Sequence, residues 1–135
     1  MKFTHSDLME YQQCLALAGD DLQVAWGVDE MLLGAWAAGC RAAVGSTYNY
    51  AAPIYRKMID ALEAGDLATA RRWSRLSVEG VVPLNRFGGI RTGKAIMAMT
   101  GIDVGPPRLP MEPLTAEEVN AVREAYERLG FFEVS

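Results

Sequence analysis

Short apolar runs alternate with polar, glycine-led loops over the first fifty residues of the chain. Two of these runs, Leu22–Trp26 and Cys40–Val44, are each followed by a glycine and then by polar side chains. Apolar runs of this length, bounded by turn residues, are typical of buried strands. Because strands that alternate with helices form right-handed parallel units, the pattern predicts parallel βαβ units at the front of the chain.

Apolar residues at helical spacing predict helices between and after these strands. Ser6 is expected to cap the first helix, which ends at Gly19. Thr115 and Glu118 have the spacing of a capping box and are expected to open the last helix. The other helices are predicted over residues 30–38, 51–64, 66–78 and 92–99.

The fold class that follows is α/β, with βα units over residues 1–50 and a mainly helical part over residues 51–135. A chain of 135 residues suits a single domain and is too short for two ordinary ones. Parallel sheets are normally covered on both faces and flanked by further strands. A sheet of so few strands would leave both edges open, which predicts that it is part of a larger sheet.

Composition excludes several classes of function. Half of the residues are hydrophobic and 22% are charged, which is typical of a packed globular protein. The net charge of −4 argues against nucleic acid as a partner. No signal peptide or membrane-spanning run is recognised, so we expect a cytoplasmic protein that does not bind a membrane. Cys14 and Cys40 lack metal-ligand spacing and are expected to be free, buried thiols, with no metal site.

Polar residues gather in the loops where the predicted strands end. Gly27, Asp29 and Glu30 follow one strand, and Ser46 follows the next. Carboxyl ends of parallel strands meet at one edge of a sheet, where α/β enzymes place their chemistry. A purely structural interpretation stays open: Asp29 and Glu30 also suit the first turn of a helix. Thr47 and Asn49 are interpreted as loop and cap residues, and Tyr48 as structural.

Three motifs carry a family resemblance: Lys2-Phe3-Thr4, Gly27-Val28-Asp29-Glu30 and Gly45-Ser46-Thr47-Tyr48-Asn49. In this order and spacing they resemble the pyruvate-dependent class I aldolases of the dihydrodipicolinate synthase and N-acetylneuraminate lyase superfamily, and within it the lyase branch. The resemblance runs from Lys2 to the C-terminus. It implies a partial (β/α)8 TIM barrel, containing the end of strand 6 and strands 7 and 8, followed by a C-terminal helical tail.

The resemblance also implies roles for individual residues. Lys2 would be the catalytic nucleophile that forms a Schiff base with a 2-keto acid, and Thr4 would line the site beside it. Gly27, Asp29, Glu30 and Ser46 would bind the sugar portion of the substrate, a role that suits carboxylates because they accept several hydroxyl hydrogen bonds. The implied reaction cleaves a sialic-acid-like 2-keto sugar acid to pyruvate and an N-acetyl hexosamine, without a cofactor.

Two departures from the family pattern bear on these expectations. Val28 stands where the lyases often have an aromatic residue, which leaves open an aldolase for another 2-keto-3-deoxy sugar acid. The family's catalytic tyrosine and carboxylate-binding loop belong to its first half, so this chain is expected to be inactive by itself. The alternative is a non-catalytic, self-associating α/β module. In either case we expect a homo-oligomer or a complement to the first half of the barrel.

Overall fold

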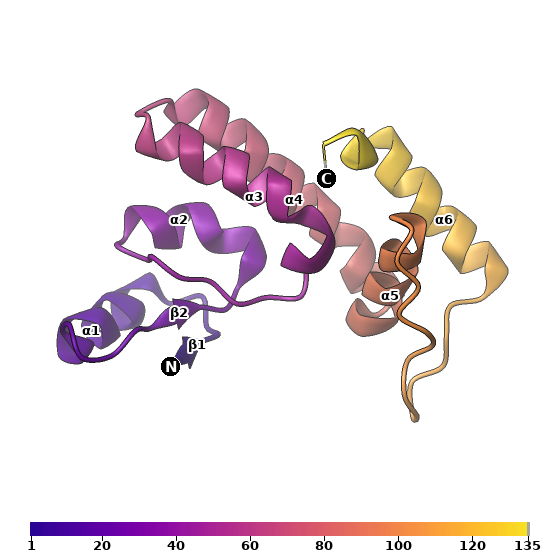
Figure 1. Cartoon of the computed structure of the whole chain (residues 1–135), viewed down its shortest axis with the longest axis horizontal. Helices are drawn as coiled ribbons and strands as arrows, with labels where there is room; N and C mark the ends of the chain where they lie inside the picture. The colour runs from indigo at the N-terminus through magenta and orange to yellow at the C-terminus, as the bar shows by residue number, and fades with distance from the viewer. Residues whose placement is uncertain (135) are drawn as a thin grey trace.

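The computed structural model describes residues 1–134 and consists mostly of helices, with a very short parallel sheet at one end (Figure 1). The sheet and the first two α-helices lie at one end, two long helices occupy the middle, and the last helices lie at the other end. In chain order the elements are β1 (Lys2–Phe3), α1 (Leu8–Ala18), β2 (Ala25–Trp26), the 3-10 helix η1 (Asp29–Met31), α2 (Leu32–Ala37), α3 (Tyr48–Glu63), α4 (Leu67–Phe87), α5 (Gly89–Met99), α6 (Ala116–Arg128) and the 3-10 helix η2 (Phe131–Glu133).

The parallel arrangement of the sheet is confirmed, but the predicted strand lengths are wrong. β1 pairs in parallel with β2, and Trp26 forms a parallel bridge to Ala43 on its other side. The predicted strand Leu22–Trp26 is reduced to its last two residues, and Cys40–Val44 to the single bridge at Ala43. A strand exists only where a neighbour accepts and donates its hydrogen bonds. Leu22 lies outside the paired region and is 50% exposed.

Aromatic side chains hold this small sheet against α1. The ring of Phe3 stacks on Trp26 with 5.8 Å between centroids, and Tyr11 meets Trp26 edge-on at 5.0 Å. Tyr11 and Trp26 are fully buried, and the Tyr11 hydroxyl donates to the Val24 carbonyl at 2.8 Å. Large aromatic rings bury much apolar area, and their packing compensates here for the small number of ladder hydrogen bonds.

Several helix boundaries differ from the sequence prediction. Asp7, and not Ser6, caps α1: its carboxylate accepts from the Glu10 amide at 3.0 Å. The predicted helix 30–38 is divided into η1 and α2, and the helices predicted at 51–64 and 92–99 begin earlier, as α3 and α5. Each of these errors lies at an N-terminus, where local capping alternatives compete and tertiary contacts select among them.

The largest error concerns α4, which was predicted to end at Val78 and continues to Phe87 through Gly80 and Pro83. Both residues normally disfavour a helix interior. Gly80 is buried because the ring of Phe131 packs over it, and the Tyr126 hydroxyl donates to the Gly80 carbonyl. Contacts from the end of the chain therefore extend this helix, and a local pattern could not indicate them.

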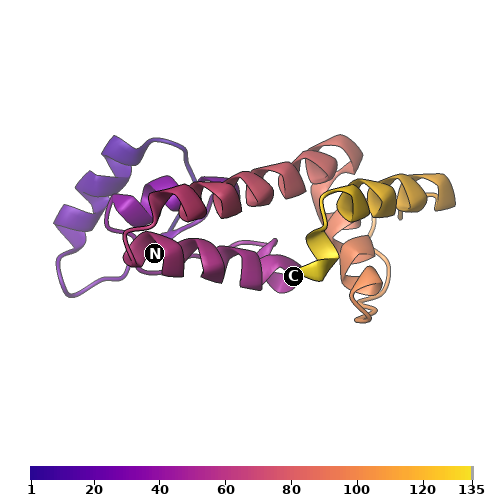
Figure 2. The ribbon, with the colours of Figure 1, turned by 90° about the horizontal axis from the view of Figure 1, so that it is seen from above.

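Helices α3 and α4 lie side by side along the middle of the molecule (Figures 1 and 2). Ile54 and Met58 of α3 are almost fully buried. The end of the chain returns to this pair, with Tyr50 and Phe131 rings 6.3 Å apart. The start of α3, which follows the polar loop 45–47, is thus packed against the C-terminal segment.

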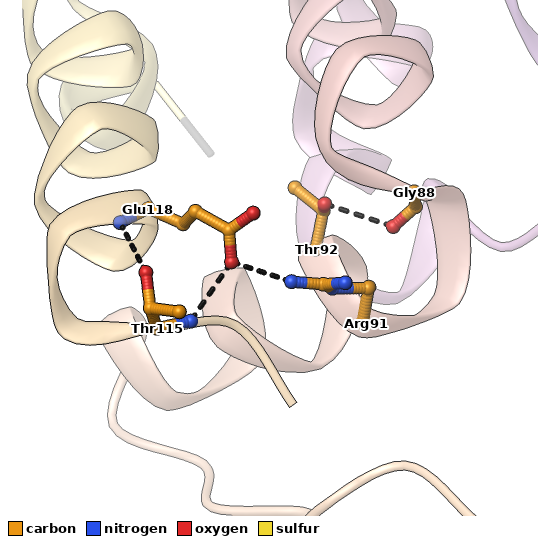
Figure 3. A network of polar contacts seen from close by, with 5 residues as sticks. All are labelled: Gly88, Arg91, Thr92, Thr115 and Glu118. Carbon is orange, nitrogen blue, oxygen red and sulfur yellow. Dashed lines mark hydrogen bonds and ion pairs between the residues drawn. The ribbon is translucent and has the colours of Figure 1, made fainter. Parts of the chain in front are cut away.

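A polar network joins α5 to α6 (Figure 3). The predicted capping box is confirmed: the Glu118 amide donates to Thr115 Oγ1 at 3.2 Å, and the Thr115 amide donates to the Glu118 carboxylate at 2.8 Å. The same carboxylate oxygen forms an ion pair with Arg91 of α5 at 2.5 Å. One side chain therefore caps its own helix and links it to the preceding one.

No helix among residues 1–134 is long and apolar enough to cross a membrane. Both cysteines are free; Cys40 is buried as predicted, whereas Cys14 is only partly buried. Within the same residues, no group of three or more His, Cys, Asp or Glu side chains is placed to hold a metal ion.

Candidate functional site

One open cavity of about 410 Å³ lies at the carboxyl ends of β1 and β2, where the sheet meets α4 and α5. All of the residues proposed from the sequence as a site line it, namely Lys2, Thr4, Gly27, Asp29, Glu30 and Ser46. They come from separate loops that parallel pairing brings to a common edge. The structure therefore places them together, as the strand-end argument predicted.

Gly27 allows the side chains of Lys2 and Thr4 to lie across the end of β2. A Cβ at this position would stand 2.6 Å from Lys2 Cε and would also overlap with Thr4 Oγ1. Every larger residue at position 27 would therefore push both side chains out of place. The indole nitrogen of Trp26 donates to the Val28 carbonyl at 2.6 Å and fixes this turn.

Asp29 is buried and holds the loop that carries Ser46. One of its oxygens, Oδ2, accepts from the Thr47 amide at 2.9 Å and from Thr47 Oγ1 at 2.5 Å. Charge-assisted bonds of this kind are about twice as strong as neutral ones. The sequence indicated only a loop or cap residue at Thr47. In the structure Thr47 also connects the two polar loops.

Tyr55 of α3 extends this network into the core. Its hydroxyl lies 2.8 Å from Thr47 Oγ1, and because the single Thr47 proton goes to Asp29, Tyr55 is the donor. Burial raises the pKa of Tyr55, so the hydroxyl stays protonated at neutral pH. Gly45 completes the arrangement, because an added Cβ there would overlap with the Asp29 carboxylate.

Other polar atoms remain available to the cavity. Among residues 1–134, Asp29 Oδ1 has no hydrogen-bond partner, although Oδ2 has two. Ser46 is exposed, and the Asn49 side-chain amide donates to its carbonyl at 2.9 Å, which orients the loop. A ligand hydroxyl in the cavity could therefore meet a carboxylate oxygen and a serine hydroxyl that no intramolecular bond occupies.

One wall of the cavity, supplied by α4 and α5, is not indicated by the sequence. Val81, Leu84 and Asn85 of α4, together with Gly89 of α5, line the same cavity. All four residues lie beyond Val78, where the sequence predicts the end of α4. No local signal marks them, because their position depends on how α4 packs against the loops.

The lysine at this site is accessible to solvent. Lys2 and Thr4 are exposed, in contrast to buried Asp29. Free lysine amines act as nucleophiles when desolvation or a nearby cation favours the uncharged form. Residues 1–134 supply the position of the amine and the polar groups around it, and they leave it in contact with water.

Comparison with known proteins gives consistent matches over almost the whole chain. The model of the dihydrodipicolinate synthetase family matches residues 1–129. The N-acetylneuraminate lyase of mouse (Mus musculus) is 38% identical over 120 residues, which cover 87% of this chain and 38% of that protein. The chain therefore spans about two fifths of the length of this curated relative.

Solved structures show the same partial coverage. The N-acetylneuraminate lyase of Proteus mirabilis matches with a TM-score of 0.92 and 38% identity, covering 97% of this chain and 44% of that one. The N-acetylneuraminate lyase, or sialic acid aldolase, of Aliivibrio salmonicida matches with a TM-score of 0.91 and 42% identity, covering 96% and 43%. The fold described above is thus an α/β arrangement that matches part of the barrel of these proteins.

Proposed function

The chain belongs to the dihydrodipicolinate synthetase family, and we propose that it forms the nucleophile-bearing part of a class I aldolase of the N-acetylneuraminate lyase type. The proposed reaction is cleavage of a sialic-acid-like 2-keto sugar acid to pyruvate and an N-acetyl hexosamine. Within this proposal β1 is the end of barrel strand 6, and β2 and the bridge at Ala43 belong to strands 7 and 8. No cofactor is needed for imine chemistry of this kind.

The observation that carries the proposal is that six residues from three separate segments of the chain line one cavity. We propose Lys2 as the nucleophile that attacks the keto carbon, with Thr4 beside it. Water leaves as the imine forms, and the protonated imine accepts the electron pair when the carbon–carbon bond breaks. Gly27, Asp29, Glu30 and Ser46 would bind the hydroxyl groups of the sugar portion, because unpaired polar groups discriminate strongly between substrates.

The proposal also assigns the catalytic groups to two different parts of the barrel. By family resemblance, the proton-transferring tyrosine and the loop that binds the pyruvate carboxylate lie in the part of the relatives that this chain does not match. The exposed position of Lys2 agrees with that division, because desolvation of the amine would have to come from other strands of a barrel. We therefore propose that residues 1–135 alone have no lyase turnover and complement that other part.

A chimera tests this directly. Residues 1–135 would replace the matching 44% of the Proteus mirabilis lyase, whose structure aligns with a TM-score of 0.92. We expect lyase turnover and, after borohydride reduction with pyruvate, a stable adduct on Lys2. The control is Lys2→Ala in the same chimera, which should fold and form no adduct. An adduct on another residue, or turnover that survives the control, would refute the proposal.

The substrate is tested on the same chimera with matched sugar acids. We expect higher kcat/KM for N-acetylneuraminate than for a 2-keto-3-deoxy sugar acid that lacks the N-acetyl group. The reverse order would favour the other candidate, an aldolase for a different sugar acid, which the presence of Val28 already suggests as an alternative. Loss of activity with both substrates would contradict the aldolase assignment itself.

The open sheet supports a second proposal about partners. β1 is paired only with β2 within residues 1–134, so its other edge presents unpaired backbone groups. Such edges associate with other strands. We propose that residues 1–135 self-associate or bind a complementary barrel half through this edge. Sedimentation velocity at micromolar concentration would test it, and a chain that stays monomeric both alone and with the complementary barrel half would contradict it.

A further inference from the structure

The helical wall of the site cavity contains one polar side chain. Val81, Leu84 and Asn85 of α4 line this wall together with Gly89 of α5. Leu84 is buried and Val81 is partly buried, whereas Asn85 is exposed. No motif in the sequence marks Asn85 as part of a site. Its side-chain amide is the polar group that this otherwise apolar wall offers to a ligand.

No structural role accounts for Asn85. Asparagine stabilises a helix interior less than leucine or alanine does, and it suits helix caps and turns better. However, Asn85 caps neither neighbouring helix: α4 ends at Phe87 before Gly88, and α5 begins without a side-chain cap. Among the asparagine side chains of residues 1–134, Asn49 alone forms a hydrogen bond. The Asn85 amide therefore keeps two N–H donors and its carbonyl acceptor for a ligand.

The elements that carry the site carboxylates and Asn85 pack against each other. Asp29 and Glu30 belong to η1, and η1 contacts α4. Carboxylates only accept hydrogen bonds, so each binds a sugar hydroxyl through the hydroxyl proton. The hydroxyl oxygen then still needs a donor, because a polar atom that loses water without gaining a partner costs free energy. A donor on the neighbouring wall completes the arrangement, and Asn85 supplies one.

Side-chain N–H donors are scarce in this cavity. Among its lining residues in the described part of the chain, only Lys2 and Asn85 carry such groups. In the proposed reaction the Lys2 nitrogen bonds covalently to the keto carbon, so it does not serve the sugar portion. The hydroxyls of Thr4 and Ser46 have one proton each. The amide of Asn85 is therefore the N–H donor that remains for the sugar hydroxyl groups.

Contacts from the end of the chain hold Asn85 in the wall. Pro83 lies one turn before it and would normally end a helix, yet α4 continues. The Phe131 ring packs over Gly80, and the Tyr126 hydroxyl donates to the Gly80 carbonyl. Asn85 thus lies on a stretch of α4 that long-range packing maintains, which fixes its position relative to the loops of the site.

We propose that Asn85 is a specificity-determining residue whose side-chain amide donates to a hydroxyl group of the sugar portion. The same hydroxyl donates its proton to Glu30 or to the unpaired Oδ1 of Asp29, so that both its donor and its acceptor are satisfied. The inference rests on the proposed function, since a hydroxylated sugar is the ligand. It extends the site from the strand ends to α4.

Nuclear magnetic resonance titration of the isotope-labelled, 135-residue chain tests the proposal, with N-acetylmannosamine as the probe. The side-chain NH2 signals of Asn85 are identified by their absence in Asn85→Leu, and we expect them to shift saturably with the sugar. Asn120 is exposed on α6 and does not line the cavity, so its side-chain signals are the internal control and should not move.

The affinity of the variants gives a second readout. Asn85→Leu should raise the dissociation constant about fivefold, as expected for one lost hydrogen bond. Leucine favours a helix and the position is exposed, so the variant should keep its helical circular dichroism. Asn85→Gln retains an amide and should recover part of the affinity. Asn120→Leu makes the same exchange outside the cavity and should leave the constant unchanged.

The outcomes separate this proposal from the aldolase proposal. The absence of a saturable shift at Asn85, an equal shift at Asn120, or an unchanged dissociation constant in Asn85→Leu would overturn the role of Asn85. If any of these occurs while Lys2 of the chimera forms its pyruvate adduct, only the inference about Asn85 fails. A shift at Asn85 with no adduct on Lys2 would leave Asn85 as a sugar contact and refute the aldolase proposal.

Discussion

In the first 47 residues, close contacts at two glycines and a buried carboxylate position the loops of the site. The helices from Tyr48 onward are stabilised instead by apolar faces, tyrosine hydroxyls and helix caps. In the first region, Gly27 and Gly45 each leave room for only a hydrogen atom beside a polar side chain. In the second, Tyr126 and Phe131 pack edge-on at 4.6 Å in the core. The site region therefore tolerates few substitutions at its loops, and the helical region depends on burial.

High pH should affect the helical region most strongly. Burial raises the pKa of all five tyrosines, and four of them, all except Tyr11, lie in α3 and α6. Above pH 10 the unfolded chain loses these protons while the folded chain keeps them, so folding stability present below pH 10 is lost as pH rises. Each tyrosine contributes up to about 1.4 kcal/mol per pH unit.

This prediction is checked by recording phenolate absorbance and far-ultraviolet circular dichroism in one alkaline titration. We expect both signals to change together, because the tyrosines ionise only on unfolding. Tyr126→Phe should make the loss of stability with pH less steep. Phenolate formation in a chain that keeps its helical signal would contradict the burial argument.

Gly45→Ala should be the most damaging single substitution in the site region. The new Cβ would overlap with the Asp29 carboxylate, which cannot move without releasing Thr47. We expect a loss of about 3 kcal/mol in the free energy of unfolding, measured by urea denaturation. Gly34→Ala in α2 is the matched control, since its Cβ would stand 3.4 Å from Leu8 Cδ1, and it should be neutral or slightly stabilising.

Thr47→Val should disrupt the hydrogen bonds that connect the site region to the helical region. The change preserves shape but removes the hydroxyl that joins Asp29 to Tyr55, which leaves two buried polar groups short of a partner. The expected cost is about 2 kcal/mol, and Ser46 should become more mobile in amide relaxation measurements. Thr100→Val, at an exposed site, should cost less than about 0.5 kcal/mol; equal losses would disprove a special role for Thr47.

The smallest effects are expected at the junction of α5 and α6 in Figure 3. Thr115→Ala removes the N-cap of α6 and should cost about 1 kcal/mol. Glu118→Gln keeps the capping geometry but removes the charge opposite Arg91, and it should cost less than Thr115→Ala. Thermal unfolding at low and high salt would check this order. Only the Glu118 effect should shrink with salt.

The polar residues of the site could be predicted because their signal is local. Glycine-led loops after apolar runs marked Gly27, Asp29, Glu30 and Ser46, and parallel pairing then required these loops to share an edge. Whether each residue binds a substrate stays a prediction. The helical wall of the cavity was not predictable in this way, because Asn85 lies beyond Val78, where the helix is predicted to end from the sequence.

The sequence by itself determined the α/β order and the capping box at Thr115, because both depend on residues close together in the chain. It also indicated the parallel direction of the strands, because strands separated by helices form parallel units. Only the tertiary structure decided the true length of α4, the role of Thr47 and the unpartnered hydroxyl of Tyr50. These features arise from contacts between residues such as Asp29 and Thr47 or Gly80 and Tyr126, which are distant in sequence. Long-range packing overrides local propensity wherever such contacts bury enough surface to compensate for it.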